Sequence, residues 1–385
     1  MSKKLRKPLL AEQRGSGHEG PRKGLPTLLK WVGGVTAILS LVLGLYQTTK
    51  LASDAVERQR QIKEKYEIGK QQQSGGDYQL AWTSFEQALK SADEGGQIAK
   101  LIGHLDAERR QMREAQEDLA MEWLRNVRLA GGQKFSDIVD KLLPVLVRGL
   151  SSASSVPKAD LLAHIGWAYF LKTRDGPGNL DPEQHYQQAL KIDPGNPYAH
   201  AHWGHLIIWK RGNQDDAIRH FSAAVASGRV LSYVRRIQLQ SLRNFRSDRT
   251  EGEFLRVVND MQRNNEKIDT GTRSDVYSIY YFALSAGENF QRLTAAVPAT
   301  DQIAMIRALF YGTDFDQSKI PGREAYLAIL QEAAGQREDA LKTWRAMRAG
   351  LSVNTYGTVV SRADAAIHRL SQRPEQKRAK GSANQ

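Results

Sequence analysis

The chain has 385 residues and a net charge of +13, with 41% hydrophobic residues, 25% charged residues and no cysteine. This length allows two or three domains, and the hydrophobic content is ample for a folded protein. The absence of cysteine excludes structural disulfides, thiolate metal sites and a cysteine nucleophile.

The positive charge is concentrated at the two ends of the chain. Residues 1–30 hold eight Lys or Arg and two acidic residues, and residues 371–385 hold four basic residues and one acidic residue. The segment between them carries only +4. A dedicated nucleic-acid groove would place basic residues on the folded part, so this distribution argues against nucleic acid as a partner. We expect two basic, disordered tails; a nucleic-acid or anionic-lipid binder using basic segments stays open as an alternative.

Residues 31–49, WVGGVTAILSLVLGLYQTT, form nineteen positions without a charge, bracketed by Trp31 and Tyr46. As a helix this stretch would span about 28 Å, close to the hydrocarbon thickness of a bilayer. It predicts a single transmembrane helix over 31–50, through which the protein contacts the membrane. The Ala-x-Ala site typical of a signal peptide does not follow it, so an uncleaved anchor fits better.

The basic residues on the two sides of this segment give conflicting indications of its orientation. The short N-terminal tail is strongly basic, which favours its retention in the cytoplasm. Residues 50–70, however, hold six Lys or Arg against four in residues 11–30. We expect a single-pass protein of a bacterial inner membrane, with a cytoplasmic N-terminus and extracytoplasmic repeats.

Residues 51–95 are predicted to form a helical stalk that runs into a first repeat, because 51–73 contain no Pro and only one Gly. This repeat has small residues and one aromatic residue at fixed spacing, namely Gly69, Gly76, Ala81, Phe85 and Ala88. The same spacing recurs in tandem over 160–194 and 197–230. The first copy contains Gly166, Tyr169, Tyr186, Ala189 and Pro194, and the second contains Gly204, Ala217, Phe221 and Ala224. A partial copy over 323–350 contains Gly335, Ala340, Trp344 and Met347.

This pattern resembles the tetratricopeptide repeat (TPR), which pairs Leu-Gly-x2-Tyr in a first helix with Ala-x3-Phe-x2-Ala in a second. Tyr186 and Phe221 are 35 residues apart, close to the family's period of about 34. The segments between the copies have helical spacing and lack the alternation typical of strands. We therefore expect an all-α fold, in which a helix-turn-helix (TPR-like) solenoid over 96–370 follows the single transmembrane helix.

Three histidines within six positions, His200, His202 and His205, are the densest group of potential metal ligands. His202 and His205 would share a helix face, whereas His200 would point about 160° away from His202. No carboxylate lies between them, as it would in HExxH. We interpret all three as histidines of a repeat helix, and a metal-dependent enzyme using His202 and His205 is the alternative.

Motifs of catalysis are absent: the chain contains no GxxxxGK[ST], GxGxxG, HExxH or GxSxG. The loop RDGPGNLDPE is rich in Gly and acidic residues but does not have EF-hand spacing. Its Asp181-Pro182 pair instead predicts the start of a helix, with Asp181 as N-cap and Pro182 at the first position. We expect neither enzymatic activity nor a cofactor.

The resemblance implies a scaffold or adaptor that binds a protein or peptide partner through the concave face of its helical array. Carried over by position, the candidate groove residues are Lys63, Tyr66 and Lys70 in the first repeat, Trp167 and Phe170 in the second, and Tyr198, His205 and Trp209 in the third. Aromatic rings would supply contact area, and the lysines could pair with acidic groups.

Overall fold

The computed structural model describes residues 28–94, 106–176, 178, 180–288, 290–311, 322–350 and 353–372, with side chains described from 40 in the first helix and from 358 in the last. Within these residues all regular structure is α-helical and no β-strand occurs, which confirms the expected all-α class. Contacts divide the chain into two compact units, Met1–Arg113 and Glu114–Gln385.

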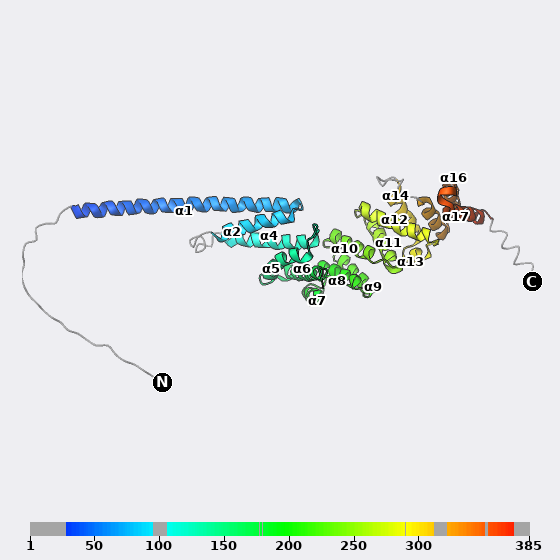
Figure 1. Ribbon diagram of the computed structural model, residues 1–385, viewed down its shortest axis with the longest axis horizontal. Helices are drawn as coiled ribbons and strands as arrows, with labels where there is room; N and C mark the ends of the chain where they lie inside the picture. The colour runs from blue at the N-terminus through cyan, green and yellow to red at the C-terminus, as the bar shows by residue number, and fades with distance from the viewer. Residues whose placement is uncertain are drawn as a thin grey trace, which may run out of the picture. The chain divides into compact units, whose positions relative to one another are not determined.

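The helices are labelled in Figure 1 in chain order. They are α1 (Leu28–Ser74), α2 (Tyr78–Asp93), α4 (Asp106–Arg125), α5 (Phe135–Gly149), α6 (Ser155–Thr173), α7 (Pro182–Ile192), α8 (Pro197–Trp209), α9 (Gln214–Ala226), α10 (Leu231–Asn244), α11 (Asp248–Arg263), α12 (Thr270–Ser285), α13 (Gln291–Ala296), α14 (Ala299–Phe310), α15 (Arg323–Ala333), α16 (Arg337–Ala349) and α17 (Val353–Ser371).

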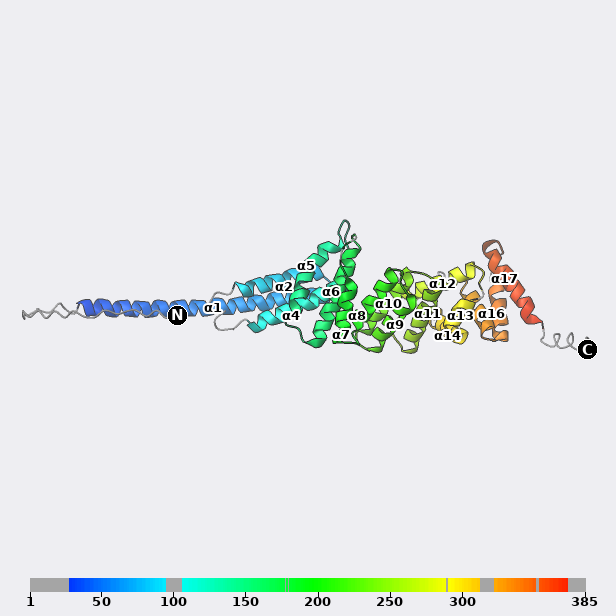
Figure 2. The ribbon, with the colours of Figure 1, turned by 90° about the horizontal axis from the view of Figure 1, so that it is seen from below.

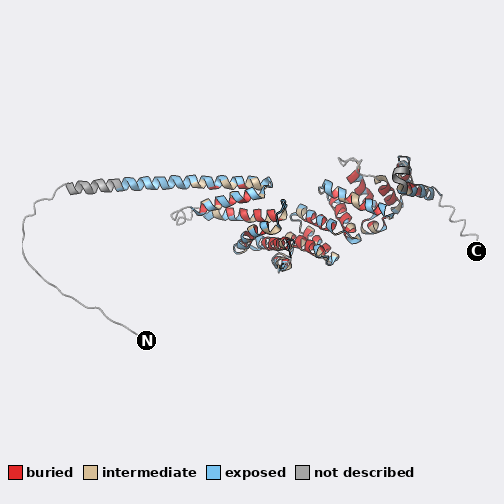
Figure 3. Ribbon diagram, viewed as in Figure 1, coloured by how far each residue is buried: buried red, intermediate tan, exposed pale blue. Residues whose placement is uncertain are grey.

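Helix α1 is continuous over 47 residues and joins the predicted membrane segment to the first repeat. Residues 40–57 are all exposed (Figure 3). Ile62 is the first buried residue among the described side chains of the helix. Among the residues with described side chains, no helix is long and apolar enough to cross a membrane. Residues 31–39 of the predicted segment 31–49 fall outside those residues.

Among the described helices, the most extensive contacts between neighbours lie within four pairs, namely α1/α2, α6/α7, α8/α9 and α15/α16. The first three pairs are labelled in Figure 2. Glycines of the first helix allow three of these pairs to approach closely. A methyl group added at these glycines would lie 2.6 Å from the ring of Phe85 at Gly69, 2.5 Å from that of Tyr186 at Gly166, and 3.1 Å from that of Phe221 at Gly204. At Gly69 and Gly166 the added methyl group would overlap the ring, and at Gly204 the ring would have to shift by a few tenths of an ångström.

The second helices of these pairs bury the residues that recur in the sequence. Their relative exposure is 0% for Ala81, Phe85 and Ala88 in α2, Tyr186 and Ala189 in α7, Ala217, Phe221 and Ala224 in α9, and Ala340 and Trp344 in α16. Burying one such aromatic side chain contributes about 1.5–3 kcal/mol. The recurrent spacing therefore marks the side chains that hold each pair together.

The acidic loop before α7 serves the ends of two helices. The carboxylate of Asp181 accepts hydrogen bonds from the backbone N–H of Glu183 at 3.1 Å and of Gln184, which confirms its predicted role as N-cap. Asp175 accepts from the backbone N–H of Phe135 at 3.1 Å and of Ser136 at 2.7 Å, at the start of α5. This loop thus ties α7 and α5 to the end of α6.

Candidate functional site

The structure separates the predicted groove residues into buried and accessible ones. In α1, Lys63 is exposed, and Tyr66 and Lys70 are half-buried. In the second unit, the three residues Trp167, Phe170 and His205 are buried, with relative exposures of 9%, 0% and 5%. Tyr198 is half-buried, and Trp209 is exposed at 38%.

The end of α4 contacts part of the face of α6 and α8 on which the buried residues lie. The indole N–H of Trp167 donates to the carbonyl of Leu124 at 3.0 Å. The Arg125 guanidinium lies 5.1 Å from the ring centre of Tyr198 and 5.8 Å from that of Tyr233. The chain itself therefore occupies this part of the predicted groove, and Trp167, Phe170 and His205 are not open to a partner here.

His202 lies in the interior as a neutral ring with both nitrogens engaged. Its Nδ1–H donates to the carbonyl of Ala163 at 3.3 Å, and its Nε2 accepts from the hydroxyl of Tyr233 at 2.6 Å. The ring stacks on Trp167 with 4.5 Å between centres. Burial lowers the pKa of His202 to about 3, with the charge of Arg125 acting in the same direction. A ring held in this way has no free nitrogen for a metal ion.

His164 and His205 flank His202 and are neutral for the same reason. Nδ1–H of His164 donates to the Asp160 carbonyl at 2.7 Å, and its Nε2 accepts from Arg125 at 2.9 Å. Nδ1–H of His205 donates to the hydroxyl of Ser241 at 2.7 Å. Burial holds the pKa of His164 well below its usual value and lowers that of His205 to about 4. Within the described part of the chain, no three His, Asp or Glu side chains are grouped to hold a metal ion.

Trp209 is the exposed last residue of α8, and it lies next to other aromatic rings. Its ring lies between Phe170 at 5.8 Å and Phe245 at 5.6 Å. The Arg174 guanidinium lies 4.8 Å from the ring centre of Trp209 and 4.8 Å from that of Phe135. Residues from α5, α8 and the segments after α6 and α10 thus form one aromatic and cationic surface, which we name the Trp209 surface.

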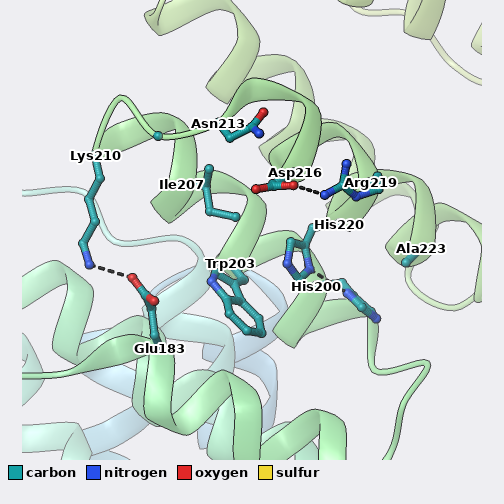
Figure 4. Close-up of a pocket in the computed structure, with 11 residues that line it drawn as sticks. Glu183, His200, Trp203, Ile207, Lys210, Asn213, Asp216, Arg219, His220 and Ala223 are labelled. Atoms are coloured by element: carbon teal, nitrogen blue, oxygen red, sulfur yellow. Dashed lines mark hydrogen bonds and ion pairs between the residues drawn. The ribbon is translucent and has the colours of Figure 1, made fainter.

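A second feature is an open depression of about 620 Å³ between α8 and α9, with Glu183 of α7 at its edge (Figure 4). Its lining residues are Glu183, His200, Trp203, Ile207, Lys210, Gly212, Asn213, Asp216, Arg219, His220 and Ala223. Lys210 pairs with Glu183 at 2.7 Å, and Arg219 pairs with Asp216. The two histidines of the depression, His200 and His220, take part in neither ion pair and contact each other instead.

Sequence reasoning missed His220, which lies next to His200 in this depression. The Nδ1 atoms of the two rings are 2.9 Å apart, although the residues are separated by 20 positions and lie on different helices. The available signal was the repeat itself, because the two packed helices of a pair bring residues of the first helix next to residues of the second. His200 was instead grouped with its neighbours in sequence, His202 and His205.

The basic segments of the alternative interpretation, 1–30 and 371–385, lie outside the described residues except for 28–30 and 371–372. No family model matches the chain, and no curated protein matches it.

Proposed function

We propose that the protein is a membrane-anchored scaffold of TPR-like helix pairs that binds a protein partner through the Trp209 surface. The observation that carries this proposal is the recurrent contact between a glycine of one helix and an aromatic ring of the next. Units of this kind bury a core only by stacking on their neighbours, and the resulting array offers a large surface for binding. The fold alone does not fix the function, so the surface and the anchor need their own support.

The anchor is supported by the exposed side chains of α1. Leu41, Val42, Leu43, Leu45 and Tyr46 are each more than half exposed. At about 100° per residue they cover about 200° of the helix circumference. Leaving one such side chain in water forgoes about 1.5–3 kcal/mol of burial. A lipid environment around 31–49 removes that penalty for the whole segment.

The binding surface is supported by its composition. Trp209 and Arg174 belong to the residue types that dominate the energetics of protein interfaces. The Trp209 ring already has fixed neighbours, so a partner would meet a preformed surface. Ordering of side chains on binding would then cost little.

The proposal is tested on the full chain in membranes, with chemical cross-linking before solubilisation and quantitative mass spectrometry of what is captured. We expect W209A and R174A to lose the same cross-linked partner that the unchanged chain retains. F282A is the matched control, because Phe282 is 55% exposed on α12, outside the Trp209 surface. Capture of the same partner at the same level by W209A would refute the surface.

The anchor is tested separately on the same membranes. We expect the protein to resist extraction by high salt and alkaline carbonate and to be released only by detergent. Reporter fusions after residue 60 and at residue 385 then give the side on which the repeats lie, for which we expect the extracytoplasmic side. Release by carbonate alone would refute the anchor without bearing on the Trp209 surface.

A further inference from the structure

His200 and His220 present two imidazole nitrogens to each other at the edge of open solvent. His200 lies in the first half of α8 and His220 in the middle of α9, and both are half-buried. Their Nδ1 atoms are 2.9 Å apart, and the ring centres are 5.2 Å apart. Figure 4 shows both rings lying in the depression between the two helices.

The tautomer of His200 is set by the turn before α8. Its Nε2–H donates to the carbonyl of Pro194 at 3.0 Å, so its Nδ1 carries a lone pair. The hydrogen between the two rings therefore belongs to Nδ1 of His220. Hydrogen bonding of the distal nitrogen to a backbone carbonyl is the usual second-shell support of a metal-binding histidine. Burial, together with the neighbouring His200 and Arg219, lowers the pKa of His220 to about 4, so the ring of His220 is neutral at pH 7.

The separation of the two nitrogens fits two ligands of one metal ion. Nitrogen–metal bonds of about 2.0–2.1 Å that meet at a right angle place the two nitrogens about 2.9 Å apart. For the lone pairs to point at the ion, each ring must turn by about 45° from the nitrogen–nitrogen line. The depression of about 620 Å³ leaves room on one side of the rings for this turn and for water ligands.

We propose that His200 and His220 chelate one divalent transition-metal ion, with Cu²⁺ preferred, through their two Nδ1 atoms. Right-angled nitrogen coordination is characteristic of Cu²⁺ and Ni²⁺, and Cu²⁺ binds nitrogen ligands more tightly than Ni²⁺ or Zn²⁺ does. Water fills the remaining positions, because no third His, Asp or Glu among the described residues joins the pair. On binding, the hydrogen on Nδ1 of His220 is lost to solvent and its Nε2 takes one up, so the His220 ring releases no net proton. This site is independent of the Trp209 surface.

Trp203 provides a built-in reporter of the ion. Its ring centre lies 4.5 Å from that of His220, and both residues line the depression. A paramagnetic Cu²⁺ ion held by His220 is close enough to quench the emission of this indole. We therefore expect saturable quenching with one Cu²⁺ per chain, and a clear loss of quenching amplitude in W203F.

The experiment uses the untagged full chain in detergent, titrated with Cu²⁺ against glycine as a competing chelator. We expect electron paramagnetic resonance to show two nitrogen ligands. H200Q and H220Q should each weaken binding by about tenfold or more, since loss of second-shell support alone commonly weakens metal binding by about 10–100-fold. H185Q is the matched control, because His185 is also half-buried on a helix and its Nδ1–H also donates to a backbone carbonyl, that of Asp181.

Far-UV circular dichroism of each variant shows whether the helices are retained, and the glutamine side chain preserves a hydrogen-bonding group at each position. Equal affinity of the unchanged chain and the H200Q/H220Q double variant would overturn the proposal. So would a spectrum with a single nitrogen ligand in the unchanged chain.

Discussion

Acidification should destabilise the second unit through its buried histidines. His202 and His205 have pKa values of about 3 and about 4 in the folded chain, mainly because of burial, against about 6.5 when unfolded. The folded state disfavours their charged form, so their contribution to stability is complete above pH 6.5 and is lost as the pH falls towards 4. Between pH 8 and pH 5 each of these histidines becomes protonated in the unfolded chain but stays neutral in the folded one. This lowers the free energy of unfolding by about 2 kcal/mol per histidine.

The two rings together should remove about 4 kcal/mol, and His164 adds to this because burial also holds its pKa well below its usual value. Whole domains are stable by only about 5–15 kcal/mol, so the effect is large. Urea unfolding of the full chain, followed by tryptophan emission at pH 8, 6.5 and 5, measures it. Other groups also titrate in this range, because burial raises the pKa of Asp160 and Asp275 and lowers that of His220, so a variant is needed to isolate His202 and His205.

The H202Q/H205Q double variant removes the two titrating groups and is the critical comparison. We expect its free energy of unfolding to fall by about 4 kcal/mol less than that of the unchanged chain between pH 8 and pH 5. The reasoning is refuted if the unchanged chain loses less than about 1 kcal/mol over this range, or if the double variant loses as much as the unchanged chain does.

Three further predictions concern single substitutions. G166A should lower the free energy of unfolding by about 1–3 kcal/mol, because the added methyl group overlaps a tyrosine ring, whereas G131A, with open space around it, should be neutral by urea titration. D175A should cost about 1 kcal/mol in the same assay, because α5 loses its acceptor at the N-terminus; an unchanged midpoint would contradict this. L41K should reduce membrane insertion by about 3 kcal/mol in a glycosylation-mapping assay, and L51K, beyond the segment, should not.

The local features of the fold could be predicted because they repeat or follow helix chemistry. The spacing of Ala81 and Phe85, or of Ala217 and Phe221, gave the buried face of each second helix, since these residues are fully buried. Asp181 was identified as an N-cap because its carboxylate can reach only the first N–H groups of α7. Such signals need no knowledge of distant segments.

The candidate sites depend on distant segments and could not be predicted in the same way. Periodicity placed Trp167 and His205 on one face of the array, but it could not show that Leu124 and Arg125 would cover that face. The repeat spacing does not relate α4 to α8. The sequence around Arg125 also does not indicate that its side chain lies beside aromatic rings. His220 was overlooked for the same reason, because its neighbour His200 was considered only in its own helix.

Because helix α1 is continuous, its length determines the distance and the rotation of the first helix pair relative to residue 50. Between residue 50 and the first buried residue, Ile62, it rises about 18 Å without a break. Seven inserted residues would raise the first helix pair by about 10 Å and turn it by only about 20°, whereas two would raise it by about 3 Å and turn it by about 200°. The number of residues between 50 and 62 thus determines how far from residue 50, and in which direction, the first helix pair lies.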